Sequence, residues 1–163
     1  MDNESEKPLD PKRLATQVDL WSYESYADDE PSENPPTLAP LLSARDVVEA
    51  VMIALNDEAK ATRHSRILVL GVVDQGEVIE RLLRLGAQVS YHDPAVARID
   101  LLDGETLESV AVSDDLLHSL DCLLIMRNDD VFDWQRIANE TRLVVDCLSA
   151  LHGIKGRARV VTL

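Results

Sequence analysis

Residues 65–94, with the sequence SRILVLGVVDQGEVIERLLRLGAQVSYHDP, decide the fold. The run Ile67–Val73 is apolar apart from one glycine, which is typical of a parallel strand buried on both faces. Apolar residues then recur at helical spacing with charges between them, and they predict an amphipathic helix over 78–85. Gly86 stands where helices commonly end, and Gln88–Tyr91 reads as a second strand. This unit predicts a right-handed strand–helix–strand crossover.

The remainder of residues 43–163 repeats this alternation. A lead-in helix is expected over 43–62, with Ser43 as its N-cap and Asp46 in its first turn. Residues 95–109 read as irregular, with a turn at Asp103-Gly104. The other predicted elements are a short strand at 110–112, helices at 115–120 and 131–139, and strands at 121–126, 142–145 and 158–162. The pattern predicts an α/β, Rossmann-like three-layer sandwich with a mostly parallel sheet.

Composition limits the classes of partner. The chain has 163 residues and 45% hydrophobic residues, enough for one domain with a substantial core. Its formal net charge of −14 argues against nucleic acid and acidic membranes as partners. No apolar run approaches the length of a membrane span, and the N-terminus is too acidic and polar for a signal peptide. We therefore expect a cytoplasmic protein.

Residues 1–42 differ from the rest in composition. They hold ten acids, three bases and several prolines, which predicts a largely disordered acidic tail. The tail also contains an aromatic cluster, Trp21, Tyr23 and Tyr26. This cluster is a candidate peptide for docking on a partner, and it is equally a candidate for folding back on its own domain.

No catalytic or metal-binding pattern stands out. The two cysteines, Cys122 and Cys147, lie in or beside apolar strands and are expected to be buried, reduced thiols. The histidines are far apart in sequence and form no pair with metal-ligand spacing. No Gly-x-Ser-x-Gly elbow is present. We expect no metal and no catalytic residue in this chain.

A dinucleotide site would need Gly-x-Gly-x-x-Gly after the first strand and an acid after the second. Asp93 occupies the position of that acid, but Gly71 and Gly76 have the wrong spacing for the glycine turn. Asp74 would also place a negative charge beside any phosphate bound there. The residues therefore argue against NAD binding by this chain alone.

The remaining candidate site is the edge formed by the carboxyl ends of the strands, where open α/β sheets bind ligands. Its one cation is Arg127, which could contact a phosphate or could pair at the surface with Asp129 or Asp130. The candidate ligand-binding residues are Gly71, Val73, Gln75, Gly76, Asp93 and Arg127.

Several segments together resemble the C-terminal, UDP-binding domain of the UDP-glucose/GDP-mannose dehydrogenase family. The matching pieces run in order along the chain: Val47–Asn56, Ser65–Val72, Leu85–Pro94, Asp121–Met126, Phe132–Trp134 and Leu143–Asp146 followed by Leu151. The resemblance implies the Rossmann-like fold and a UDP or UDP-sugar ligand. In the family, NAD is bound by an N-terminal domain, and the catalytic cysteine lies in a central domain.

The departures from the family concern its ligand contacts. The family follows its first strand with Ala-Tyr-Lys-Pro-Asp and then Arg-Glu-Ser-Pro, which the resemblance implies contact the UDP-sugar. Here Val73-Asp74-Gln75 replaces the first piece, and the second has no counterpart. Cys147-Leu148-Ser149 stands where the family usually has Thr-Arg-Asn. Burying a diphosphate without cations is costly, so ligand binding should be weakened.

Two functions remain open from the sequence. The first is a stand-alone, degenerate UDP-binding-type domain with at most residual nucleotide-sugar binding. It would be inactive alone, and a separate dehydrogenase chain is a candidate partner. The second is a non-catalytic interaction or regulatory module that engages a partner protein through its acidic aromatic tail. No cofactor is expected for this chain alone.

Overall fold

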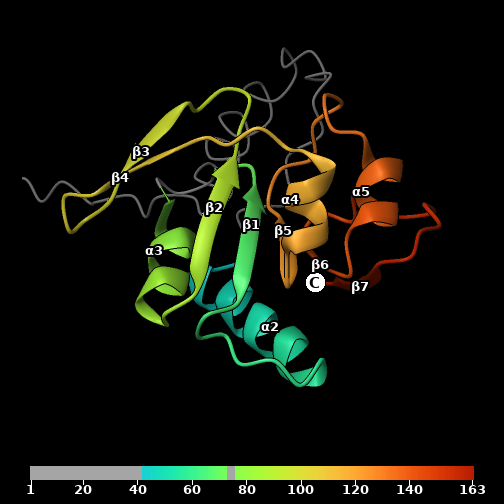
Figure 1. The fold of residues 1–163 in the computed structure, drawn as a ribbon, viewed down its shortest axis with the longest axis horizontal. Coiled ribbons are helices and arrows are strands. Elements are labelled where there is room, and N and C mark those ends of the chain that lie inside the picture. The colour runs from blue at the N-terminus through green and yellow to red at the C-terminus, as the bar shows by residue number, and fades with distance from the viewer. Residues whose placement is uncertain (1–41, 73–75) are drawn as a thin grey trace, which may run out of the picture. The chain divides into compact units, whose positions relative to one another are not determined.

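A five-stranded parallel sheet forms the centre of the molecule (Figure 1). The computed structural model describes residues 42–72 and 76–163. The strands lie in the order β2-β1-β5-β6-β7, and every neighbouring pair is parallel. They are β1 Arg66–Leu70, β2 Gln88–His92, β5 Cys122–Ile125, β6 Leu143–Asp146 and β7 Arg159–Thr162. The predicted α/β class with a parallel sheet is confirmed.

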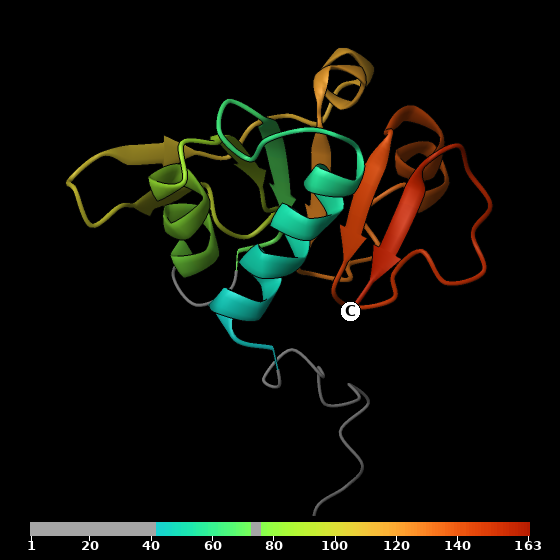
Figure 2. The same ribbon diagram turned by 90° about the horizontal axis from the view of Figure 1, so that it is seen from below.

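Helices cover both faces of this sheet (Figures 1 and 2). The helices α2 (Ala44–Asp57) and α3 (Glu77–Arg84) pack with Ile67 and Val69 of β1. The helices α4 (Asp114–Ser119) and α5 (Trp134–Glu140) pack on the other face with Leu68 and Leu70. These four strand residues are at most 1% exposed. Burial on both faces explains why the strand is an unbroken apolar run.

The lead-in helix is shorter than the predicted 43–62. Ser43 caps α2, as expected, and the Asp46 side chain completes a capping box by accepting from the Ser43 backbone N–H. The helix ends at Asp57, because Ala59 adopts a left-handed conformation with φ of +56° and the chain turns away. Lys60 lies beyond the helix, and its ammonium pairs with Asp121, the residue directly before β5.

The segment predicted to be irregular contains an antiparallel hairpin. Its strands are β3 (Arg98–Asp100) and β4 (Thr106–Glu108), and the predicted turn at Asp103-Gly104 lies between them. Residues 110–112 form no strand, contrary to the sequence prediction. The Val110 N–H instead donates to the Tyr91 carbonyl at 2.9 Å and holds this segment beside β2. The prediction failed because three-residue strands carry almost no periodic signal.

The helix α5 begins at Trp134 rather than at residue 131. Asp133 caps it by accepting from the Arg136 N–H, so the residues before it form a turn instead of helix. Other predicted elements differ from the observed bounds by one to three residues.

Some predicted residues lie outside the described part of the chain. These include the aromatic cluster Trp21, Tyr23 and Tyr26, and the site candidates Val73 and Gln75. Among the described residues, no helix combines the length and apolar character needed to cross a membrane.

Candidate functional site

The carboxyl ends of β1 and β5 meet at the point where the strand order reverses. Counted along the chain, the sheet strands have the order 2-1-3-4-5, which places the topological switch between β1 and β5. Gly71 follows β1, Asp93 follows β2 and Arg127 follows β5. The structure therefore brings three of the predicted site residues together at the edge where such sheets bind ligands.

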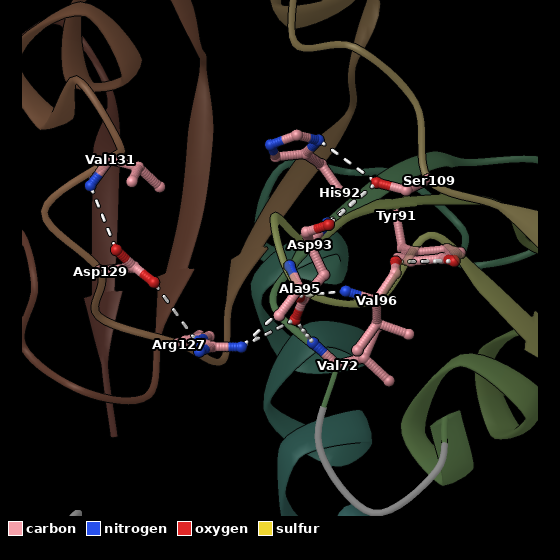
Figure 3. A network of polar contacts seen from close by, with 10 residues as sticks. All are labelled: Val72, Tyr91, His92, Asp93, Ala95, Val96, Ser109, Arg127, Asp129 and Val131. Carbon is pink, nitrogen blue, oxygen red and sulfur yellow. Dashed lines mark hydrogen bonds and ion pairs between the residues drawn. The ribbon is translucent and has the colours of Figure 1, made fainter.

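Asp93 is held by the backbone of its own domain (Figure 3). Its carboxylate accepts the N–H groups of Val72 at 2.8 Å, Ala95 at 2.7 Å and Val96 at 3.0 Å. Its side chain is fully buried, with 0% exposed. The sequence placed this acid where a ribose-binding residue stands in dinucleotide-binding proteins. The structure shows it bonded to the loop after β2 and to the end of β1 instead.

The electrostatics of Asp93 favour the charged form. Burial acts to raise the pKa of this carboxyl, but the N–H groups of Val72 and Ala95 and the Arg127 guanidinium outweigh it. The net effect holds the pKa of Asp93 below its ordinary value. The residue is thus an anion that is stabilised in place, which suits a structural role.

Arg127 is shared between two carboxylates (Figure 3). One terminal nitrogen lies 3.4 Å from both oxygens of Asp93, and its Nε lies 3.6 Å from Asp129. The pairing with Asp129 was one alternative from the sequence, whereas the pairing with Asp93 was not foreseen. The side chain remains 41% exposed, and the contacts are long for charge-assisted hydrogen bonds. The guanidinium therefore keeps donors that an anion could reach.

Gly71 has a packing role at this junction. A Cβ atom at this position would lie 2.2 Å from the Arg127 Cβ and 3.0 Å from its backbone nitrogen. The Met126 N–H donates to the Leu70 carbonyl at 2.9 Å, which fixes the two strand ends against each other. The glycine that sequence analysis placed near a ligand is required here because the chain itself passes so close.

Gly76 is the N-cap of α3 and is buried, with no side chain to satisfy the first N–H groups of the helix. It lies beside Ile99 of the hairpin, whose Cδ1 would be 3.3 Å from an added Cβ. Because Val73 and Gln75 fall outside the described residues, the turn that joins Gly71 to Gly76 is not described.

Asp146 at the end of β6 is a second buried carboxylate that sequence analysis did not assign. It accepts the N–H groups of Leu148 at 3.1 Å, Ala150 at 3.0 Å and Leu151 at 2.9 Å. An acid directly after a buried strand, followed by a short loop, is the pattern that could have indicated this role. At the edge, two carboxylates therefore occupy backbone N–H groups that could otherwise receive an anion.

Cys147 follows β6 at this edge, whereas Cys122 begins β5 and lies at the opposite, amino end of that strand. Burial raises the pKa of both Cys122 and Cys147 to about 12, which keeps the thiols protonated at neutral pH. Both cysteines are free, as predicted; Cys122 is buried as expected, whereas Cys147 is only partly buried. Across residues 42–72 and 76–163, no group of three acidic, histidine or cysteine side chains is arranged to hold a metal ion.

A hollow of about 210 Å³ lies away from this edge, between α3 and the β3–β4 hairpin. It is lined by Glu80, Leu83, Arg84, Leu101, Leu102 and Asp103. None of these residues comes from the ends of the sheet strands, so the hollow is separate from the candidate site.

A parallel sheet in this order, covered by helices on both faces, defines a Rossmann-like domain of the kind found in dehydrogenases. Residues 74–153 match the model of the UDP-glucose/GDP-mannose dehydrogenase family, UDP binding domain. This match confirms the family resemblance predicted from the sequence over those residues. The matched segment contains Asp93, Arg127 and Asp146.

Two solved structures share the fold. One is UDP-D-ManNAc dehydrogenase from Pyrococcus horikoshii, with 13% identity, a TM-score of 0.51, and 71% of this chain and 30% of that chain covered. The other is the NAD-dependent formate dehydrogenase from Staphylococcus aureus in complex with NAD, with 18% identity, a TM-score of 0.50, and coverages of 73% and 46%. The matched region thus spans less than half of either structure. A search of curated proteins gave no match.

Proposed function

We propose that residues 43–163 form a non-catalytic UDP-binding-type domain that binds a UDP or UDP-sugar weakly at the switch point between β1 and β5. The observation that carries this proposal is the position of Arg127 at that point, exposed by 41% and joined only by long contacts to two carboxylates. The family match over residues 74–153 supplies the chemical class of the ligand.

Weak binding follows from the local charges. A diphosphate carries about two negative charges and needs cations to offset its desolvation. Asp93 and Asp129 both stand within 3.6 Å of the single guanidinium and would repel such a group. The family's lysine is replaced in this chain by Val73-Asp74-Gln75. We also propose that this domain binds no NAD and oxidises nothing by itself, because its sequence lacks the dinucleotide glycine turn and because the family's catalytic cysteine belongs to a different domain.

Calorimetric titration of the full chain with UDP, UDP-glucose, GDP-mannose and NAD tests the proposal. We expect weak, saturable binding of the uridine ligands only. Arg127→Ala should weaken it by about tenfold, the scale of a lost charge-assisted hydrogen bond. Arg159→Ala is the matched control. Arg159 is also paired with two carboxylates and is 44% exposed, but it is the first residue of the outermost strand β7 and does not belong to the candidate site. Equal affinities in the two variants would remove Arg127 from the site.

Asp129→Asn should strengthen UDP binding by about threefold, because it removes one negative charge near the guanidinium while the site stays solvated. The substitution keeps an oxygen that can accept the Val131 N–H, which Asp129 now accepts at 3.2 Å. Titration at low salt and again at high salt measures the change. A gain that persists at high salt would point to a change of loop structure instead of electrostatics.

The ion pair with Asp93 favours a second candidate, an interaction module that has lost ligand binding. In that case the nucleotide position is occupied by the domain's own charges, and a partner protein would be engaged through Trp21, Tyr23 and Tyr26. The same titration decides between the two. No heat with any nucleotide, from a sample shown to be folded by circular dichroism, supports the interaction module.

A further inference from the structure

The two edges of the sheet differ in how they are covered. At the β2 edge, the Val110 N–H donates to Tyr91, and the Ser109 hydroxyl accepts the Asp93 N–H at 3.1 Å. The β3–β4 hairpin lies along the same side (Figure 1). At the other edge, β7 pairs with β6 (Figure 2). No other strand of the described chain pairs with β7.

Some backbone hydrogen-bonding groups of β7 point away from β6, on the outer side of the strand. The N–H groups of Arg159 and Leu163 donate toward β6, to Arg142 at 2.8 Å and Asp146 at 3.2 Å. Because backbone groups alternate along a strand, those of Val160 and Thr162 face away from β6. Within the described residues, no segment provides these groups with a hydrogen-bond partner. The Val160 side chain is also 39% exposed.

The C-terminal segment that contains β7 is basic in an otherwise acidic chain, although the Asp57 and Glu58 carboxylates pair with Arg159. Residues 147–163 contain Lys155, Arg157 and Arg159 and no acid, although the whole chain has a net charge of −14. Arg142 lies beside the start of β7, through its bond to Arg159. Arg142, Lys155 and Arg157 are exposed, and none forms an ion pair with another described residue.

We propose that the outer edge of β7 binds an acidic, extended peptide segment of a partner protein by strand addition. The Val160 and Thr162 backbone groups would pair with the peptide, and Arg142, Lys155 and Arg157 would neutralise its carboxylates. The negative charge of the rest of the chain disfavours nucleic acid at the same place. It favours a short peptide that contacts only the region of Arg142, Lys155 and Arg157.

A fluorescent, end-blocked peptide of alternating Glu and Val residues is the probe, titrated with the full chain and followed by anisotropy. We expect saturable binding that weakens as salt is raised. Val160→Pro should weaken it by about fivefold, because it removes one outward N–H without touching the bonds to β6. The double variant Lys155→Glu, Arg157→Glu changes only exposed loop residues and should abolish binding even if the proline variant fails to fold.

Two controls make the result specific. Arg84→Glu reverses an exposed charge on α3 and should leave the affinity unchanged. A Glu-Pro peptide of the same charge cannot pair as a strand and should not bind. Binding of that peptide with equal affinity, or no binding of the Glu-Val peptide, would overturn the proposal. A dimer that forms without peptide and dissociates in Val160→Pro would also overturn it, because the edge would then serve a second copy of the chain.

Discussion

Gly71→Ala is expected to lower the free energy of unfolding by about 2 to 5 kcal/mol, the combined scale of left-handed strain and an overpacked contact. The residue has φ of +86°, and a Cβ there would lie 2.2 Å from the Arg127 Cβ. To relieve this clash between the two Cβ atoms, the end of β5 would have to move away from β1. That movement would break the bond between Leu70 and Met126 and pull Arg127 from Asp93.

Gly104→Ala separates the two causes. Gly104 has φ of +87°, close to that of Gly71, but apart from its two chain neighbours no described residue has an atom within 4 Å of an added Cβ. It should therefore show only the backbone strain, about 1 to 2 kcal/mol. Urea unfolding of both variants measures the difference. Equal losses of stability would mean that the close approach of β1 and β5 costs nothing to relieve, contrary to this structure.

Hydrophobic patterning alone was enough to predict the sheet. The apolar runs in β1, β5 and β6 are buried on both faces, which is typical of a parallel sheet with helices on each side. The N-cap of α2 at Ser43 was also predicted, because Ser43 and Asp46 act within a single turn. These features depend on neighbours in sequence, so one sequence suffices to find them.

Features that depend on distant partners were not predictable in this way. Asp93 could be placed after β2, but its bond to Val72 joins residues 21 positions apart, and its pairing with Arg127 spans 34 positions. The β3–β4 hairpin was missed for a different reason. Its buried residues, such as Ile99, are too few to form a period, and they are buried by packing against the core cluster on the α2–α3 face.

Asp93→Asn is expected to destabilise the domain by about 2 to 4 kcal/mol at neutral pH. An asparagine offers one oxygen to the three N–H groups that the carboxylate now accepts, and its own amide group would face donors instead of acceptors. Arg127 would also lose its buried partner, although its exposure limits that cost. Asp130→Asn is the matched control, because Asp130 is exposed and lies close in sequence to Arg127.

The pH dependence of this effect has a definite sign. The folded state holds the pKa of Asp93 below its ordinary value, so the charged form stabilises the fold at pH values above about 4, the range of an unfolded aspartate. That stabilisation is lost as the pH falls through the lowered pKa, where the carboxyl becomes protonated in both states. The stability difference between the wild-type chain and Asp93→Asn should therefore be largest near neutral pH and should shrink in acid. Urea midpoints measured from neutral pH to about pH 3 test this. A difference that stays constant over that range would show that the charge of Asp93 does not stabilise the junction of β1, β2 and β5. The lower stability of the variant would then come only from the hydrogen-bonding geometry of the asparagine amide.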